Sequence, residues 1–170
     1  MVIKKKWNLR YSSKKLKIEY DRVMAHIMGE SFKKPDYMGT WKIDGGEVLG
    51  GFSSFFIWTN SRKSEFDNGE WEDAWGSALV SGEITSKRAY LNMSYLKNNG
   101  KDLKDPIIFK GKCSYPGIIH EPSARIYRGP YTSDLERKDH DGFFILTPYQ
   151  DSPTIRAFIT NLKRINFNRR

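Results

Sequence analysis

The chain has 170 residues, of which 38% are hydrophobic and 14% aromatic, and it carries a formal net charge of +9. This composition excludes a disordered chain, and the length fits one domain with a substantial core. The apolar runs are shorter than the roughly 20 residues that span a bilayer. The basic N-terminus lacks the apolar stretch of a secretory signal, and Cys113 is the only cysteine, which excludes an intramolecular disulfide. We therefore expect a reducing, cytoplasmic setting.

The positive charge is concentrated at the two ends of the chain. Residues 1–34 hold ten Lys/Arg against three acids, and residues 152–170 hold five Lys/Arg and no acid, so the ends carry +7 and +5. Residues 35–151 must then carry −3. A general nucleic-acid-binding surface on the β domain is therefore disfavoured, and no specific nucleic-acid readout is expected. Attraction to a phosphate-rich partner is expected from the ends.

Residues 1–34 are predicted to form a basic helical arm. Leu16, Tyr20, Val23 and Ile27 follow helical spacing and place one apolar stripe on a helix over 13–29. Two interpretations remain open. The helix packs on its own domain, or it acts as an interaction arm for an anionic membrane surface, nucleic acid or a second subunit.

Residues 35–150 are predicted to form the β domain. Short alternating segments bounded by Gly, Pro and Asn predict strands at 37–43, 48–59, 78–85, 89–96, 107–113, 124–131 and 142–147. The polar stretch 60–76 is predicted to be a long loop, either an ordinary connection or a functional loop over a barrel mouth. Small and large residues alternate on the inward faces of three of these strands, which is typical of a small tapered barrel.

The last two predicted strands form a hairpin. Phe143 and Ile145 share one face of the second strand, and Phe144 and Leu146 share the other, so both faces need cover. Gly129-Pro130 is predicted to mark a bulge, an edge or the end of the first strand.

Residues 151–170 are predicted to form a second helix that packs on the barrel. Ser152 is a suitable cap, and Pro153 occupies the favoured first position. The helical apolar positions are Ile155, Phe158, Ile159, Leu162 and Ile165. The predicted fold is therefore mainly β: a single antiparallel up-and-down barrel of about eight strands, calycin- or lipocalin-like, flanked by N- and C-terminal helices.

Catalysis is not predicted. His26, His120 and His140 fall in separate segments without metal-ligand spacing, and the nucleophile, zinc and phosphate-loop motifs are missing from the sequence. We expect a non-enzymatic protein without a metal or a cofactor.

Binding is better supported by the residue pattern. Arg125, Tyr127, Arg128 and Tyr131 interleave guanidinium and aromatic groups, and Arg125 shares a face with Tyr127. An arginine next to aromatic rings holds a planar anion by forked hydrogen bonds and stacking. The alternative is a set of surface salt bridges with the acids of 134–141. Trp41, in the opening strand, and Tyr95, on an inward face, complete the candidate ligand-binding set.

Three segments carry a resemblance to a known family: PDYMGTW at 35–41, LNMSYLKNNG at 91–100 and YRGPYTSDLERKDHDGFFIL at 127–146. The Gly-x-Trp opening strand looks like that of calycin-type barrels. More closely, the segments resemble the β-barrel sensor domain of STING-like effectors of bacterial anti-phage (CBASS) systems. The resemblance implies an eight-stranded barrel that binds a cyclic nucleotide and oligomerises. The sequence departs from those effectors in lacking their transmembrane helices.

The sequence thus predicts a barrel that binds a small ligand. The most specific version of this prediction is a cyclic-nucleotide sensor in anti-phage defence. The alternative is a protein-interaction or structural module whose barrel is filled and whose basic helices contact a partner or a membrane surface. An open, partly polar interior would favour the first, and an interior filled by Trp41, Phe109 and Phe143 would favour the second.

Overall fold

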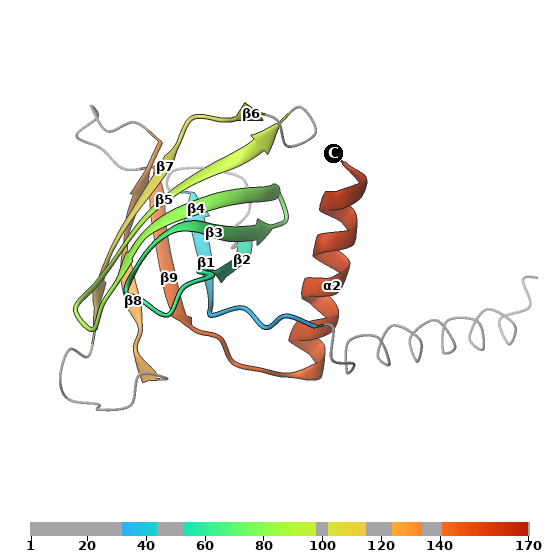
Figure 1. Ribbon diagram of the computed structural model, residues 1–170. Coiled ribbons are helices and arrows are strands. Elements are labelled where there is room, and N and C mark those ends of the chain that lie inside the picture. Colours follow the sequence, from blue (N-terminus) through green and yellow to red (C-terminus); the bar gives the residue numbers. More distant parts are fainter. Residues whose placement is uncertain (1–31, 44–52, 98–101, 115–123, 134–140, 170) are drawn as a thin grey trace, which may run out of the picture.

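The computed structural model describes residues 32–43, 53–97, 102–114, 124–133 and 141–169. These residues form nine strands and one helix (Figure 1). The strands are β1 (Tyr37–Ile43), β2 (Ser53–Trp58), β3 (Glu65–Asp73), β4 (Gly76–Ile84), β5 (Arg88–Lys97), β6 (Asp102–Leu103), β7 (Ile107–Cys113), β8 (Tyr127–Thr132) and β9 (Gly142–Pro148), and the helix is α2 (Pro153–Asn168). The predicted helix over 13–29 lies outside the described residues.

Eight of the strands close into an antiparallel barrel. The sheet order is β4-β3-β2-β1-β9-β8-β7-β5-β6, and β4 also pairs with β5, which joins the two sides of the sheet. The short β6 lies outside this ring and pairs only with β5. Apart from β6, every strand pairs with its neighbours in sequence, and β1 pairs with β9. The predicted mainly-β, antiparallel, up-and-down barrel is therefore confirmed.

The barrel interior is filled by aromatic rings. Phe109 lies at the centre, and its ring centroid is 5.2 Å from those of Trp71 and Phe144 and 5.3 Å from that of Tyr131. Phe55 stacks on Trp71 with centroids 4.0 Å apart and planes 11° apart. Gly39 makes room for this stack, because an added Cβ there would lie 2.3 Å from the Phe55 ring. The packing of the Phe55 ring therefore explains why the Gly-x-Trp segment has glycine at position 39.

Helix α2 covers the outer face of β2. The Ser152 hydroxyl caps it by accepting a hydrogen bond from the Ile155 amide at 3.1 Å. Ile159 and Leu162 are buried against Phe56 and Trp58. In Figure 1 the helix stands on one side of the barrel, with β7 and β8 on the other. Because β7 and β8 lie across the ring from β2 and β3, α2 leaves that wall uncovered.

The predicted helical stripe packs only in part. Ile159 and Leu162 are buried, whereas Phe158 is 47% exposed and Ile165 44% exposed. The two exposed residues are seven positions apart on one side of the helix, and the Phe158 ring still contacts Phe56 on β2, with ring centroids 5.9 Å apart. The five apolar positions span too wide an arc for one strand face to cover.

The prediction of a loop over 60–76 is wrong for much of its length. Residues 65–73 form β3, which pairs with both β2 and β4. Its acidic residues are typical of a solvated loop, but Phe66, Gly69 and Trp71, which lie between them, are buried. Trp71 faces the interior, while Glu70 faces solvent. The buried side is stabilised by Phe55, a partner that this segment alone does not reveal.

Strand β9 also differs from expectation on its outer face. Phe144 and Leu146 are buried in the interior, but Phe143 is 49% exposed and Ile145 38% exposed. The ring that fills the interior is therefore Phe144 and not the expected Phe143. Gly129 and Pro130 lie within β8, where both pair with β9. Because proline has no N–H, the paired residues of the β7–β8 ladder lie on either side of this point.

These neighbouring phenylalanines provide a test of the register. Phe144→Ala should lower the free energy of unfolding by about 3–5 kcal/mol, because it removes a ring from the packed interior. Phe143→Ala is the matched control and should cost less than about 1 kcal/mol. Urea denaturation of both variants is the measurement. Equal losses would contradict the assignment of inward and outward faces.

Candidate ligand-binding site

A pocket of about 480 Å³ opens at one end of the barrel. We call it the mouth pocket. It lies where the start of β1, the β2–β3 connection, the end of β4 and the segment leading into β8 meet. Its floor is the apolar end of the barrel interior, formed by Phe66 and Ile84. The filled core lies below, so a ligand at this end would bind on the barrel and not inside it.

Three cations and one carboxylate line the mouth pocket. Arg62 and Lys63 come from the β2–β3 connection, Arg125 precedes β8, and Asp36 precedes β1. The Asp36 carboxylate is already engaged, because one of its oxygens accepts hydrogen bonds from the Thr59 amide at 2.7 Å and the Thr59 hydroxyl at 3.0 Å. The excess of positive charge therefore favours an anion.

Two tyrosines stand beside Arg125 in this pocket. Burial raises the pKa of Tyr37 to about 12, helped by the nearby Tyr127 and Asp36, while Arg125 acts in the opposite direction. Burial also raises the pKa of Tyr127. The Tyr127 hydroxyl donates a hydrogen bond to the Thr85 carbonyl at 2.5 Å, which fixes its ring against the β4–β5 turn. Both phenols are therefore neutral near pH 7, and Tyr37 brings a neutral O–H to the site beside the Arg125 charge.

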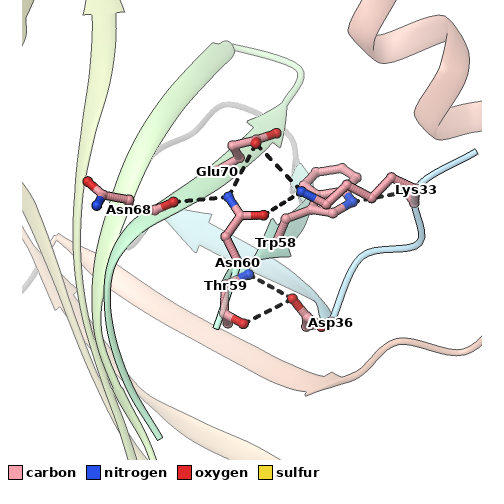
Figure 2. A network of polar contacts seen from close by, with 7 residues as sticks. All are labelled: Lys33, Asp36, Trp58, Thr59, Asn60, Asn68 and Glu70. Atoms are coloured by element: carbon pink, nitrogen blue, oxygen red, sulfur yellow. Dashed lines mark hydrogen bonds and ion pairs between the residues drawn. The ribbon is translucent and has the colours of Figure 1, made fainter. Parts of the chain in front are cut away.

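The rim of the pocket is held by a polar network (Figure 2). The Trp58 indole donates to the Lys33 carbonyl at 3.0 Å, and the Lys33 ammonium contacts both Asn60 and Glu70. The Asn60 amide nitrogen donates to the Asn68 carbonyl at 3.0 Å. Asn60 has a φ of 55°, a left-handed conformation that asparagine tolerates better than most residues. The network ties the segment before β1 to the β2–β3 connection, so Asp36 and Thr59 keep fixed positions.

The structure places the six predicted ligand residues at four locations. Arg125 and Tyr127 line the mouth pocket together. Trp41 and Tyr131 are neighbours inside the packed core, with ring centroids 5.1 Å apart. Arg128 is exposed on the outer wall, and Tyr95 lies toward the opposite end of the barrel, where it contacts Asp73.

That opposite end contains a buried carboxylate. Asp73 accepts hydrogen bonds from the Trp71 indole at 2.8 Å, the Trp75 amide at 2.8 Å, the Gly76 amide at 3.1 Å and the Tyr95 hydroxyl. Burial raises its pKa, and the four donors partly offset this effect. Burial and the Asp73 charge raise the pKa of Tyr95. With every donor directed at one carboxylate, this cluster stabilises the β3–β4 turn and leaves no open position for a ligand.

Helix α2 closes over the same turn. The Asn166 amide nitrogen donates to a Glu72 carboxylate oxygen at 2.7 Å and to the Asp73 carbonyl at 3.0 Å. Arg169 donates to the Ala74 carbonyl at 3.0 Å. These contacts fix the C-terminal end of α2 to the barrel.

Sequence reasoning missed most of the mouth pocket. Tyr37, Arg62, Lys63 and Ser64 lie far from Arg125 in sequence and meet it only because the barrel closes through β1, β9 and β8. Only the alternation along β1 could have pointed to Tyr37, because Tyr37, Gly39 and Trp41 share a face of the strand. No sequence pattern pointed to Arg62 and Lys63, because they lie in the segment that was predicted to be a solvated loop.

Comparisons of the chain with protein-family models, with curated proteins and with solved structures found no match. The resemblance to the sensor barrels stays a prediction, and the protein's class is defined by its fold, a closed eight-stranded antiparallel barrel with a C-terminal helix. Across the described residues, the structure shows no group of His, Cys, Asp and Glu side chains suited to hold a metal ion. Within the same residues, no helix has the length and apolar character needed to cross a bilayer.

The Asp73 cluster predicts a pH-dependent stability. Because the folded-state pKa of Asp73 is raised, its ionisation makes the free energy of unfolding fall as pH rises from about 4 through that pKa. Tyr95→Phe removes a donor that favours the carboxylate, so it should cost about 1.5–3 kcal/mol at pH 8 and clearly less at pH 4.5. Urea denaturation at both pH values measures this, with the exposed Tyr90→Phe as control. A Tyr95→Phe loss that is the same at both pH values would contradict the assignment.

Proposed function

We propose that this barrel binds a small phosphate-bearing ligand in the mouth pocket. The observation that carries the proposal is the placement of Arg125 beside Tyr37 and Tyr127 in a pocket of about 480 Å³ at the end of a filled barrel. This volume is within the range of natural small-molecule sites. The proposed activity is binding without chemistry, because the lining supplies charge and hydrogen-bond donors suited to hold an anion.

The chemistry of the lining favours phosphate over carboxylate. The Arg125 guanidinium presents a forked pair of donors, and Arg62 and Lys63 add positive charge from a different side of the pocket. The partly buried Tyr37 ring offers apolar surface next to these charges, which suits a ligand that joins a phosphate to a planar base. A cyclic nucleotide fits this description, and the resemblance to sensor barrels makes it the first ligand to test.

A second function is favoured by a separate observation. The interior is filled by Trp41, Phe55, Trp71, Phe109 and Phe144, which is the condition expected of a structural or protein-interaction module. In that case the barrel is a rigid scaffold, and the mouth pocket is a solvated hollow at its end. The two proposals differ in whether a small ligand stabilises the protein.

The first proposal predicts a ligand-dependent rise in melting temperature. A panel of cyclic mononucleotides, cyclic dinucleotides, linear nucleotides and inorganic phosphate should contain at least one compound that stabilises the protein. The gain is about 4 kcal/mol at a concentration about 1,000 times Kd. Arg125→Ala should weaken the binding of that compound by about 1.5–3 kcal/mol with little change in stability.

Arg128→Ala is the matched control, because it removes the same group three residues away on the outer wall. It should leave the affinity for the stabilising compound unchanged. Equal weakening by both variants would place the ligand outside the mouth pocket. A panel in which no compound shifts the melting temperature would remove the small-ligand proposal and favour the interaction module.

A further inference from the structure

The outer wall across β5, β7 and β8 gathers positive charge that the sum of −3 over residues 35–151 conceals. Arg88, Lys112 and Arg128 are register partners on three successive strands, and all three are exposed. Neighbouring strands lie about 4.8 Å apart, so these cations form one closely spaced row. Lys110 lies two residues from Lys112 on the same outward face. Three exposed acids of the barrel, Glu65, Asp67 and Glu70, lie on β3 on the far side.

This wall is also hollowed. A groove of about 570 Å³ is lined by Lys87, Arg88, Tyr90, Lys110, Lys112 and Glu83. Glu83 is the one acid that lines it among the described residues, and it is paired with Arg88 at 2.8 Å. The lysines of the groove therefore keep an excess of charge for a partner from outside the barrel.

Exposed aromatic rings continue the same surface. Tyr90, which is 40% exposed, is the register partner of Lys110 on the neighbouring strand. On the other side, Phe143 is 49% exposed and is the register partner of Pro130 on β8 and of Lys42 on β1. The outward face across these strands thus alternates cations with rings, and α2 lies across the barrel from it.

We propose that this outer wall, defined by Arg88, Tyr90, Lys110, Lys112, Arg128 and Phe143, binds single-stranded nucleic acid without sequence readout. A row of cations attracts the phosphate backbone, and exposed rings stack with unpaired bases. An acidic peptide would use the cations but not the rings. A membrane surface is too flat to enter a groove in the side of a barrel. The inference is independent of the mouth pocket, since it uses different residues.

The test is fluorescence anisotropy of a labelled 15-nucleotide oligo(dT) with the full chain at several salt concentrations. With about four phosphate contacts, affinity should fall about 50-fold between 50 and 200 mM salt. The variant Lys110→Ala/Lys112→Ala should reduce the slope of log K against log salt by about 1.4. The control Lys97→Ala/Arg164→Ala removes two exposed charges outside the wall and should keep the wild-type slope. This control is needed because the ends of the chain also attract polyanions.

The rings separate nucleic acid from other polyanions. Tyr90→Ala and Phe143→Leu should each weaken oligo(dT) binding about fivefold or more, because stacking is lost while charge is kept. Phe158→Leu, at a ring of similar exposure on α2, should change nothing. The proposal is overturned if the ring variants bind oligo(dT) as tightly as the wild type. It is overturned as well if Lys97→Ala/Arg164→Ala reduces the slope of log K against log salt as much as Lys110→Ala/Lys112→Ala does. It is also overturned if vesicles of one part phosphatidylserine to three parts phosphatidylcholine bind through the wall lysines while oligo(dT) does not.

Discussion

The packing of Phe109 is the contact on which the rest of the barrel depends. This ring from β7 lies within about 6.3 Å, centroid to centroid, of rings on β1, β2, β3, β8 and β9. One side chain therefore links six of the eight barrel strands through direct aromatic contacts. Offset and edge-on ring pairs of this kind add to the free energy gained by burying their area. Because the rings occupy the interior, the two proposed binding sites lie at one end of the barrel and on its outside.

The two ends of the barrel illustrate opposite uses of buried polar groups. At the β3–β4 turn, Asp73 has its oxygens matched to four donors, and Asn166 closes the turn from α2. A buried carboxylate that accepts four hydrogen bonds rigidifies the turn around it. At the mouth, Arg125, Arg62 and Lys63 outnumber the one carboxylate, whose oxygen is held by Thr59. Imbalance of charge in a concave, partly apolar site is the property expected of a binding site.

The sequence predicted the parts of this fold that depend on local alternation. Strands at residues 107–113 and 142–147 were correctly located, because their inward and outward residues repeat with period two. Strand β3 was missed because its exposed acids resemble a loop, and its inward Trp71 is stabilised by a ring on β2. The exposure of the outer face was equally hard to predict, because alternation shows that Phe143 and Ile145 share a face but not how much of that face is exposed.

Two residues of the candidate site could be predicted from the sequence, but the residues that join them from other strands could not. The shared face of Arg125 and Tyr127 follows from alternation, but Tyr37 and Lys63 join them through strand pairing over long distances in sequence. The charge of the outer wall shows the same limit. Residues 35–151 sum to −3, yet the register between β5, β7 and β8 lines up Arg88, Lys112 and Arg128, which are 24 and 16 residues apart in sequence. The net charge of a segment therefore does not show how its charged side chains are distributed over the folded surface.

The central claim, a filled interior, is tested most directly by hydrogen exchange of the tryptophan indoles. The Trp41 indole N–H has no hydrogen-bond partner among the described residues, so its protection reports packing alone. NMR in deuterated water should show Trp41 exchanging only through global unfolding. Trp75, which is 66% exposed, should exchange within the dead time. A Trp41 indole that exchanges as fast as that of Trp75 would show that water reaches the interior, and would contradict the account.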